Sequence, residues 1–537
     1  MGQLGIKLEP HSKEPLHRQI FDQVVARIES HVFPAGYKLP PSRTLAHELG
    51  AHRNTVARAY ADLEAGGFVY AGVGRGTFVS EPERRAASAG ATSTAGSHLD
   101  LSEQREAREL RELRELRELR ELRELPWTGL LSRAARSDIV GRSQRHVRAS
   151  NRRDQINLAR MQPSPDIIPD ALLKRCLTHV LSEHGADVLG YAPPEGVLRV
   201  REQIARDLVQ RGVPARADEV LLTSGSQQAL DLIARSLIDP GDAVLMEPST
   251  YSGAIEVFTL AGARLVSVPM DEHGPDPHAL ARLSRQDVKA LYLMPNAHNP
   301  TGRTLSTERR RALVAWSRNA GVPIIEDDYA AGLTLDDSAS PPHLRALDAE
   351  VIHLSTFSKC LAPGLRLGYL VAPARLLPVF TSLKRMFDLG ASLPFQHTLA
   401  EFMERGYLRA HRRRVAREYR ERRDALHGAL TKWLPRSVHW ELPSHGVVLW
   451  LRLPTGLDPQ LVYEEALRRG VLVSPSMAWS MDTTSEPALR LTFCAEPAER
   501  LVQGARRLAQ AIRPLLAQSS RRAQDLGHAA GPMQEVV

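Results

Sequence analysis

The sequence has few cysteines and no long hydrophobic run. Its three cysteines, Cys176, Cys360 and Cys494, are odd in number and far apart in the chain, which argues against a disulfide framework and against a zinc site. They fit a reducing cytoplasm. The N-terminus lacks a basic segment followed by an apolar one, and no run of about eighteen apolar residues occurs. We therefore expect a soluble, intracellular protein with no membrane partner.

The chain is long and basic. Its 537 residues, of which 43% are hydrophobic, suffice for several domains with large cores. The formal net charge of +8 favours contact with a polyanion, although a basic surface alone does not identify a nucleic-acid-binding protein.

Residues 15–63 show the pattern of three short helices. Apolar residues at every fourth position from Leu16 to Ile28 predict an amphipathic helix. Ser42 is expected to cap a second short helix, and a third helix is expected over 53–63 after a turn. The side chains expected to face inward from the third helix are Val56, Tyr60 and Leu63. The exposed residues at its start, where they can reach base edges in a major groove, are Arg53, Asn54 and Thr55.

A glycine-rich stretch between two apolar segments predicts a hairpin after the helices. Segments 67–70 and 77–79 flank Ala71-Gly-Val-Gly-Arg-Gly76, with Arg75 at the tip. A phosphate-binding loop is the alternative for this glycine run. Such a loop needs a helix directly after it, whereas a strand is expected here.

Residues 10–80 resemble the winged helix-turn-helix domain of GntR-type bacterial repressors. The motifs that carry the resemblance are Leu39-Pro-Pro-Ser-Arg43, Arg53-Asn-Thr-Val56 and Gly74-Arg-Gly-Thr-Phe-Val79. The resemblance implies binding to double-stranded operator DNA. The contacts it implies are Arg43, Arg53, Asn54, Thr55, Arg75 and Gly76. Solvation of helix ends is the alternative role for Arg43 and Arg53. His52 and Ala57 depart from the family pattern, so the base sequence that is recognised stays open.

Residues 81–150 form a predicted linker. The small, polar segment 86–97 predicts a flexible chain. In the Arg-Glu-Leu repeat over 108–125, the period of three falls short of the helical repeat, so the leucines move around a helix and form no coiled-coil seam. Each arginine meets a glutamate four residues on. We interpret the repeat as a solvated helical spacer that ends at Pro126; a dimerising or partner-binding helix is the alternative.

From Asn157 onward, apolar β-branched runs alternate with helical segments. This pattern predicts buried parallel strands joined by crossover helices. The predicted strands are 219–223, 243–246, 290–294 and 322–326. Ligand groups in such a sheet come from the loops after the strands.

The stretch 355–370 contains the lysine around which this domain is organised. A lysine amine attacks an aldehyde only when part of it is unprotonated, which requires apolar groups or another cation nearby. The neighbours of Lys359 that offer both are Leu361, Ala362 and Arg366. The side chains that could hold a phosphate are Thr356, Ser358 and Arg366. A surface lysine before a Pro-Gly turn is the alternative. The stretch resembles the phosphate cup and lysine of fold-type I pyridoxal-phosphate (PLP) enzymes, S-K-x-x-x-P-G-x-R-x-G.

Polar and aromatic side chains follow the predicted strands. The backbone N–H groups of Ser226 and Gln227 open a helix and can bind a phosphate. Tyr251 offers a stacking face for a flat pyridine ring, with a place in the core as its alternative. Asp327 can keep a pyridine nitrogen protonated, which makes the ring an electron sink. The side chains that could bond to the phenolic oxygen of the cofactor are Asn299 and Tyr329.

Together these motifs resemble aminotransferases of fold type I over about residues 155–515. The resemblance implies PLP held as a Schiff base by Lys359. The catalytic residues it implies are Lys359, Asp327 and Tyr329. Tyr191 matches the residue that reaches the phosphate of the neighbouring subunit, which implies a homodimer. Arg490 matches the arginine that clamps a substrate carboxylate; an ion pair at a strand edge is the alternative.

A winged helix, a long linker and an aminotransferase-like domain are the plan of the MocR subfamily of GntR regulators, and the chain is identified as a member. The basic segment 409–423 also resembles the helix that enters the small domain there. The resemblance implies a multidomain fold. Its parts are an α+β winged helix-turn-helix over 10–80, a linker over 81–150, an α/β large domain with a smaller α+β C-terminal domain over 151–516, and a polar, frayed tail over 517–537.

The implied function is a DNA-binding transcription regulator that senses an amine, an amino acid or a PLP vitamer. A working PLP-dependent aminotransferase with an appended DNA-binding domain is the alternative, because both would retain the same cofactor residues. The segment 330–335 and Cys360 depart from the family pattern, so the effector stays open, as do the operator and the target genes.

Overall fold

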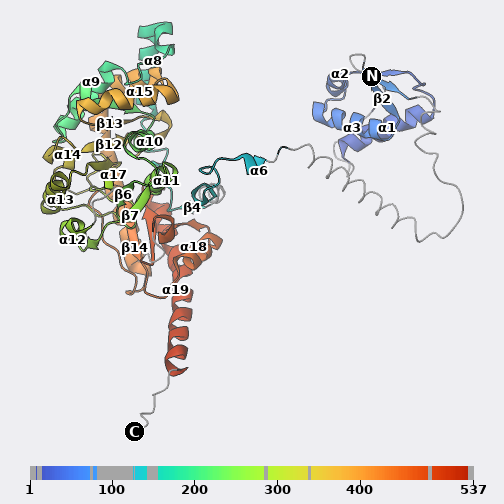
Figure 1. Ribbon diagram of the computed structural model, residues 1–537. Helices are drawn as coiled ribbons and strands as arrows, with labels where there is room; N and C mark the ends of the chain where they lie inside the picture. The colour runs from blue at the N-terminus through green and yellow to red at the C-terminus, as the bar shows by residue number, and fades with distance from the viewer. Residues whose placement is uncertain are drawn as a thin grey trace. The chain divides into compact units, whose positions relative to one another are not determined.

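The computed structural model describes Ile6, Leu8, 15–72, 76–80, Leu125, 127–141, 155–283, 288–336, 340–481 and 486–529. The chain divides into two compact units, Met1–Gly129 and Leu130–Val537 (Figure 1). Three predictions fall outside the described residues: the hairpin tip at Arg75, the flexible segment 86–97 and, apart from Leu125, the Arg-Glu-Leu spacer. The unit boundary lies inside the predicted linker, so residues 130–141 belong to the larger unit.

The first unit packs three helices against a small antiparallel sheet. The helices are α1 (Leu16–Glu29), α2 (Ser42–Glu48) and α3 (Arg53–Ala65), and the strands are β1 (Lys38–Leu39), β2 (Val69–Gly72) and β3 (Gly76–Val79), in the order β1-β3-β2. Val56, Tyr60 and Leu63 are buried as predicted. Each fully buried aliphatic side chain stabilises this core by about 1.5–3 kcal/mol.

Two details of the first unit differ from the sequence prediction. Ser42 is the first helical residue rather than the cap, because Pro41 occupies the N-cap position and no side chain caps α2. Strand β1 was not predicted, since two residues give no alternating pattern. It pairs with β3, where Lys38 lies opposite Phe78.

A seven-stranded mixed sheet forms the centre of the second unit. Its strands are β5 (Val220–Thr223), β6 (Ala243–Met246), β7 (Arg264–Ser267), β10 (Val288–Leu293), β11 (Ile324–Asp328), β12 (Ile352–Thr356) and β13 (Gly368–Val371), in the order β5-β13-β12-β11-β10-β6-β7. The four predicted strands are present. Strand β13 was not among the predicted strands, and unlike the parallel pairs predicted for this sheet it runs antiparallel to both β12 and β5. The chain between β12 and β13 is the short segment that carries Lys359, too short for a parallel crossover.

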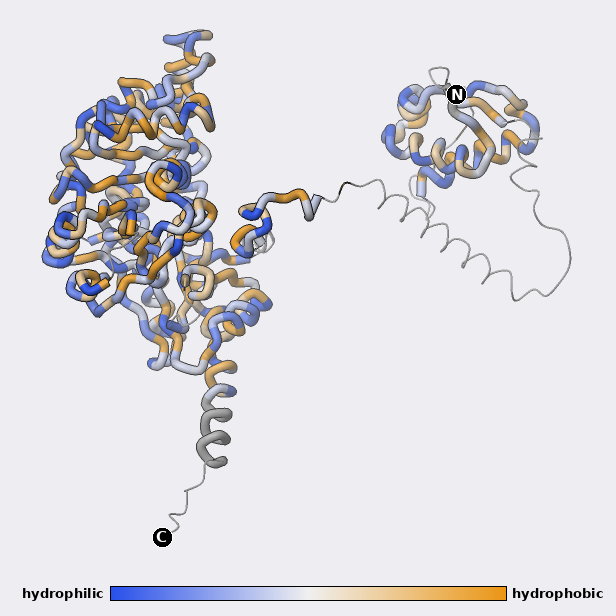
Figure 2. Tube along the Cα trace, in the orientation of Figure 1, coloured by the Kyte–Doolittle hydropathy of each residue, from blue (hydrophilic) through white to orange (hydrophobic). Residues whose placement is uncertain are grey.

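Helices cover this sheet (Figure 1). They are α8 (Asp170–His184), α9 (Leu198–Gln210), α10 (Ser226–Leu237), α11 (Ser252–Leu260), α12 (Pro277–Arg282), α13 (Thr307–Ala320), α14 (Leu344–Leu347), α15 (Leu377–Asp388) and α16 (Leu393–Glu404). Short 3-10 turns lie at Gly185–Leu189, Ala217–Glu219, Pro363–Leu365, Ala374–Leu376 and Ser476–Ala478. Helix α10 packs on β5, β12 and β13. Apolar and hydrophilic segments alternate along the chain of this unit (Figure 2). Strands β5, β6, β11, β12 and β13 are buried along their whole length, whereas the edge strand β7 is only partly buried.

The smaller α+β part follows α16. Its antiparallel sheet has the order β14-β17-β16, and β15 pairs in parallel with β4. The strands are β4 (Ile156–Asn157), β14 (Val448–Arg452), β15 (Val471–Leu472), β16 (Ser474–Pro475) and β17 (Ala488–Thr492), and the helices are α17 (Tyr407–Trp433), α18 (Pro459–Arg468) and α19 (Ala498–Ala529). Further described elements are α6 (Trp127–Leu130) and the hairpin of β8 (Met270–Asp271) and β9 (Gly274–Pro275).

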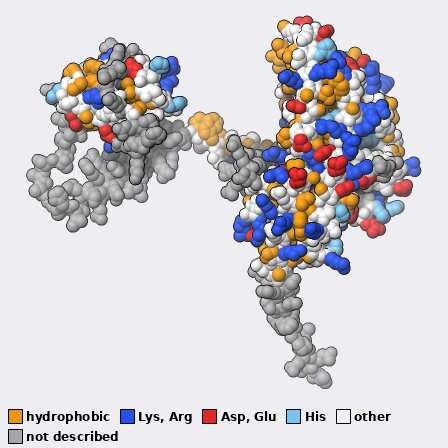
Figure 3. All heavy atoms as spheres, turned by 180° about the vertical axis from the view of Figure 1, so that it is seen from behind, with side chains coloured by type: hydrophobic (Ala, Val, Ile, Leu, Met, Phe, Trp, Pro, Cys, Tyr) orange, Lys and Arg blue, Asp and Glu red, His pale blue; other side chains and the backbone are white. Residues whose placement is uncertain are grey.

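Several charged residues of the second unit are buried in ion pairs. The predicted basic helix 409–423 lies within α17, and three of its arginines are buried in ion pairs. These pairs are Arg412 with Asp207, Arg422 with Asp166 and Arg423 with Asp336. On the face seen in Figure 3, basic side chains are interspersed with acidic ones. The net positive charge therefore does not gather into a single basic stripe on that face.

The C-terminal helix is longer than predicted. Helix α19 continues to Ala529, past residue 517, at which the polar tail was predicted to begin. The segment 517–529 is polar, but seven of its thirteen residues are Ala, Arg or Gln, which all have high helix propensity. None of the described helices is long and apolar enough to cross a bilayer.

Candidate functional site

A cavity of about 570 Å³ lies at the ends of the central strands of the second unit. It brings together eleven predicted residues from segments far apart in the chain: Ser226, Gln227, Tyr251, Asn299, Asp327, Tyr329, Thr356, Ser358, Lys359, Arg366 and Arg490. A larger cavity, of about 720 Å³, is lined instead by residues such as Glu247, Glu272 and His298. The chemistry of the predicted residues belongs to the first cavity.

Lys359 follows β12 and points its amine toward the segment after β4. Nζ donates a hydrogen bond to the carbonyl oxygen of Met161 at 2.7 Å. Burial lowers the pKa of Lys359 below its ordinary value, and Arg490 and Arg366 lower it further. A larger fraction of the amine is therefore unprotonated at a given pH, which is the state that attacks a carbonyl carbon.

Asp327, at the end of β11, is 1% exposed and only half satisfied. Its Oδ2 accepts a hydrogen bond from the hydroxyl of Tyr292 at 2.8 Å, whereas Oδ1 is buried and has no hydrogen-bond partner among the described residues. Burial raises the pKa of Asp327 to about 7. An unpaired buried acceptor is costly, and a protonated ring nitrogen is a group that would satisfy it. The site therefore fits the pyridine ring of PLP.

The residues predicted to hold a phosphate surround the start of α10. Oγ1 of Thr356 donates to Oγ of Ser358 at 2.9 Å. Nη2 of Arg366 donates to the carbonyl oxygen of Ser224 at 2.8 Å. Gly225 is the N-cap of α10 with a φ of +99°, and a Cβ there would lie 3.2 Å from Nη2 of Arg366. Hydroxyls, a guanidinium and free backbone N–H groups at a helix start are the donors that a phosphate dianion requires.

Two tyrosines form part of the cavity wall. The hydroxyl of Tyr251 donates to Oε1 of Gln227 at 2.9 Å, and Nε2 of Gln227 donates to the carbonyl oxygen of Gly253. The side chain of Gln227 thus orients the predicted stacking ring. Burial raises the pKa of Tyr251 to about 12, so its hydroxyl stays protonated. Tyr329 donates to the carbonyl oxygen of Ala297 at 2.7 Å, so its predicted bond to a phenolic oxygen would have to replace this one.

Arg490 lies on the central strand of the small sheet, β17, and is 4% exposed. Nη1 donates to Oδ1 of Asn299 at 3.1 Å, and Nη2 donates to the carbonyl oxygen of Ala159. The guanidinium carbon lies 4.0 Å from the ring centroid of Trp479, and Nε is buried without a hydrogen-bond partner among the described residues. Burial lowers the pKa of Arg490 to about 10. A buried cation with neutral partners is suited to a carboxylate ligand. The alternative role for Arg490, an ion pair at a strand edge, does not agree with these contacts, because Asn299 and the carbonyl oxygen of Ala159 are neutral.

Among the residues of this site that the sequence analysis did not predict are Trp479 and Tyr292. Trp479 lines the cavity and stacks on Arg490, but it stands in no motif and becomes visible only when β16 is paired with β17. Tyr292 lies inside the apolar run of β10. Its hydroxyl was a signal that could have been used, because a buried tyrosine hydroxyl needs a partner.

Tyr191 is the predicted cofactor residue that the structure does not bring to the cavity. It is 86% exposed. Its predicted contact with a neighbouring subunit stays a prediction.

The predicted DNA contacts lie at the starts of α2 and α3. Arg43, Arg53 and Asn54 are exposed, and Thr55 is half-buried. His52, which departs from the family pattern, caps α3: its Nδ1 accepts a hydrogen bond from the backbone N–H of Asn54 at 3.3 Å. Arg75 lies outside the described residues, and Gly76 begins β3. Their contacts with DNA stay predictions.

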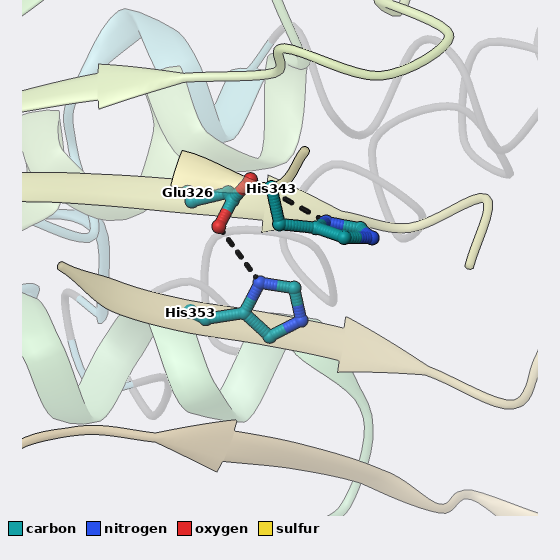
Figure 4. Close-up of side chains that lie close together, drawn as sticks. All are labelled: Glu326, His343 and His353. Carbon is teal, nitrogen blue, oxygen red and sulfur yellow. Dashed lines mark hydrogen bonds and ion pairs between the residues drawn. The ribbon is translucent and has the colours of Figure 1, made fainter. Parts of the chain in front are cut away.

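Glu326, beside Asp327 but on the opposite face of β11, forms a cluster with the half-buried His343 and the buried His353 (Figure 4). Nδ1 of His353 lies 3.0 Å from Oε2 of Glu326. The two carboxylate oxygens also accept backbone N–H groups of Leu344 and Arg345 at the start of α14. Burial alone would raise the pKa of Glu326, but the bonds to the two histidines hold it well below its ordinary value. Through these hydrogen bonds the cluster joins α14 and β12 to β11.

Two families match the chain. Residues 153–508 match the family Aminotransferase class I and II, and residues 16–79 match Bacterial regulatory proteins, gntR family. The HTH-type transcriptional regulator YisV of Bacillus subtilis is 30% identical over 508 residues, which cover 94% of this chain and 97% of that protein. The 2-aminoadipate transaminase of Thermus thermophilus is 33% identical over 396 residues, 71% of this chain and 98% of that protein.

Solved aminotransferase structures share the fold of the second unit. The multiple substrate aminotransferase from Thermococcus profundus has a TM-score of 0.69 at 30% identity, covering 73% of this chain and 100% of its own. LysN of Thermus thermophilus, complexed with N-(5'-phosphopyridoxyl)-L-leucine, has a TM-score of 0.67 at 31% identity, with the same shares of 73% and 100%.

The second unit therefore has the class I and II aminotransferase fold, with PLP as its cofactor. With its gntR-family DNA-binding domain, the chain belongs to the MocR subfamily of GntR-type transcriptional regulators.

Proposed function

We propose that this DNA-binding regulator holds PLP covalently on Lys359 and senses an amine, an amino acid or a PLP vitamer in the cavity beside it. The observation that carries the proposal is the unpaired Oδ1 of Asp327, which lines the same cavity as Lys359. A buried acceptor of this kind is stabilised by a protonated ring nitrogen. The winged helix on the same chain binds operator DNA, so that sensing in the cavity can change transcription.

The residues of the cavity divide the work of binding. When bound, the cofactor supplies a ring that withdraws electrons from an attached amine. Asp327 holds the proton on the ring nitrogen, and Tyr251 covers one face of the ring. Arg490 binds the carboxylate of an amino-acid effector, and Lys359 holds the attachment and can accept a proton when it is released. The groups that bind the phosphate are Ser226, Thr356, Ser358 and Arg366.

We also propose that the protein is a homodimer. In the segment that leads into α9, Leu189 is 68% exposed and Tyr191 86%, and Leu198 at the start of α9 is 55% exposed. Large apolar side chains exposed together are typical of a protein interface. Light scattering of the full chain should give twice the monomer mass, and Tyr191→Ala should weaken PLP binding if the tyrosine reaches the partner's phosphate. A monomer that binds PLP normally would refute this part.

The main proposal is tested on the attachment itself. Purified protein incubated with PLP should show Schiff-base absorbance, and borohydride should then fix the cofactor to the peptide that contains Lys359. Lys359→Ala should lose the fixed label. Lys289→Ala, which removes a lysine near the start of β10, two strands away from β12 and at the opposite end of the sheet, is the matched control and should keep the label. Label on another lysine would refute the assignment.

A second function, PLP-dependent transamination, is favoured by one observation. Lys359 and the buried Arg490 line the same cavity, which is the pair of groups that a transaminase needs for its proton transfers and its substrate carboxylate. Production of keto acid over many turnovers would establish this activity, whereas a single turnover or none would leave sensing as the function.

A further inference from the structure

One linker residue is buried against the aminotransferase-like unit. Every described side chain from residue 127 to residue 136 is exposed, among them Leu130 at 62% and Leu131 at 44%. Ile139, on a helical turn that begins at Asp138, is 6% exposed. The linker is therefore attached to the larger unit at Ile139 well before the aminotransferase-like domain begins in the sequence.

Ile139 lines a small hollow of about 320 Å³ between two parts of that unit. One wall is the start of α11, with Ser252 and Ile255. The other wall is the turn after β16, with Met477 and Ala478. We call this hollow with its two walls the linker seat.

Both walls of the linker seat continue into the cofactor cavity. Ser252 and Glu256 line both the linker seat and the cofactor cavity. Both lie on α11, whose N-cap is Tyr251. On the other wall, Ala478 precedes Trp479, which stacks on Arg490. The backbone N–H of Thr250 bonds to the carbonyl oxygen of Trp479 at 2.9 Å. The segment that covers the cofactor ring and the segment that covers the effector arginine thus meet at the linker seat.

We propose that the linker seat transmits the state of the cavity to the linker, and through it to the winged helix. The inference rests on the proposed function and adds the structural route by which effector binding reaches the winged helix. A carboxylate at Arg490 competes for the guanidinium with Trp479, Asn299 and the carbonyl oxygen of Ala159. A shift of Trp479 moves Ala478 relative to α11, and this changes how tightly Ile139 fits. The two arrangements are the linker seat with Ile139 tightly packed and the seat with Ile139 loosened, and a ligand acts only through its different affinity for them. Allosteric couplings of this kind change the affinity for the second ligand, here operator DNA, on the order of 5- to 150-fold.

The test compares Ile139→Ser with Leu131→Ser in the full chain. Leu131 is a linker residue of the same character that is already exposed, so its variant controls for the change of polarity. Ile139→Val keeps most of the packing and should behave as wild type. Three quantities are measured: Schiff-base absorbance on titration with pyridoxal 5'-phosphate, amide hydrogen exchange of residues 138–141, and affinity for an operator fragment with and without pyridoxal 5'-phosphate.

In wild type, filling the cavity should change the exchange of residues 138–141 and shift operator affinity. In Ile139→Ser the PLP concentration at half-maximal Schiff-base absorbance should stay within about twofold of wild type. Residues 138–141 should exchange rapidly with and without PLP, and at least about four-fifths of the PLP-induced shift in operator affinity should be lost. Leu131→Ser should keep that shift. Absence of the absorbance in wild type would refute the proposed function, and the inference with it. Normal absorbance with unchanged exchange at 138–141, or an Ile139→Ser variant with the full affinity shift, would overturn the linker seat alone.

Discussion

The hydroxyl of Tyr292 donates a hydrogen bond to Oδ2 of Asp327 at 2.8 Å, and the other oxygen of the same carboxylate has no partner among the described residues. One bond from the protein fixes the carboxylate, and one acceptor is left for the ligand. This arrangement orients Asp327 before the cofactor arrives.

Tyr292→Phe should therefore weaken PLP binding without abolishing it. Loss of one hydrogen bond to a carboxylate costs about 1.5–3 kcal/mol, which corresponds to a dissociation constant raised roughly ten- to hundredfold. Tyr369→Phe is the matched control. It removes the hydroxyl of another buried tyrosine of the same sheet, one that accepts a hydrogen bond from Arg211 instead of bonding to Asp327. Absorbance titrations in which both variants bind PLP equally well would contradict the role of Tyr292.

The cofactor-free protein should lose stability as pH rises through the titration of Asp327. Its folded pKa, raised to about 7 by burial, exceeds the unfolded value, so the stabilising contribution of the protonated form is full at low pH and is lost between about pH 4 and 7. A tenfold difference in proton affinity between the folded and unfolded chain corresponds to about 1.4 kcal/mol of stability. Asp327→Asn should flatten this part of the stability curve, measured by denaturant unfolding from pH 4 to 8. A variant that keeps the wild-type slope would show that Asp327 is not its source.

Arg490→Ala should lose affinity for carboxylate-bearing effectors only. A bidentate bond between a guanidinium and a carboxylate is worth about 1.5–3 kcal/mol, so such effectors should bind roughly ten- to hundredfold more weakly. Amines without a carboxylate should be unaffected. Arg452→Ala, on the neighbouring strand β14 and paired with Glu441, is the control. Equal losses for both kinds of amine would mean that Arg490 acts through the fold.

Arg53→Ala should relax the base preference of the winged helix. Loss of a bidentate contact to guanine costs roughly 1–3 kcal/mol at the affected base pair. Arg18→Ala on α1, where the arginine pairs with Asp22, should leave base preference unchanged. Footprinting and competition with mutated sites measure the difference; a variant with the wild-type preference would exclude Arg53 from base recognition.

The sequence predicted best those residues whose roles follow from short motifs. Lys359 and Arg366 lie in one stretch, and Asp327 directly follows a strand that its apolar run predicts, so all three could be assigned to the cavity from linear spacing. Trp479 could not, because its contact with Arg490 depends on how β16 pairs with β17. The antiparallel direction of β13 and the length of α19 were missed for a similar reason: packing and chain connection decided them, and local composition did not.

The burial of Ile139 shows the same limit. Its sequence neighbourhood does not mark this isoleucine, because Ile139 and the adjacent Val140 form a short apolar pair without helical or strand periodicity. Its docking partners are separated from it by more than a hundred residues along the chain.

The central claim is that the protein senses its effector through the PLP held covalently on Lys359. An operator titration of Lys359→Ala tests this claim most directly. Affinity for operator DNA is measured with and without candidate amines and PLP, for wild type and variant side by side. The account predicts that Lys359→Ala binds the operator as wild type does but no longer changes its affinity when these ligands are added. A variant that responds like wild type would contradict it.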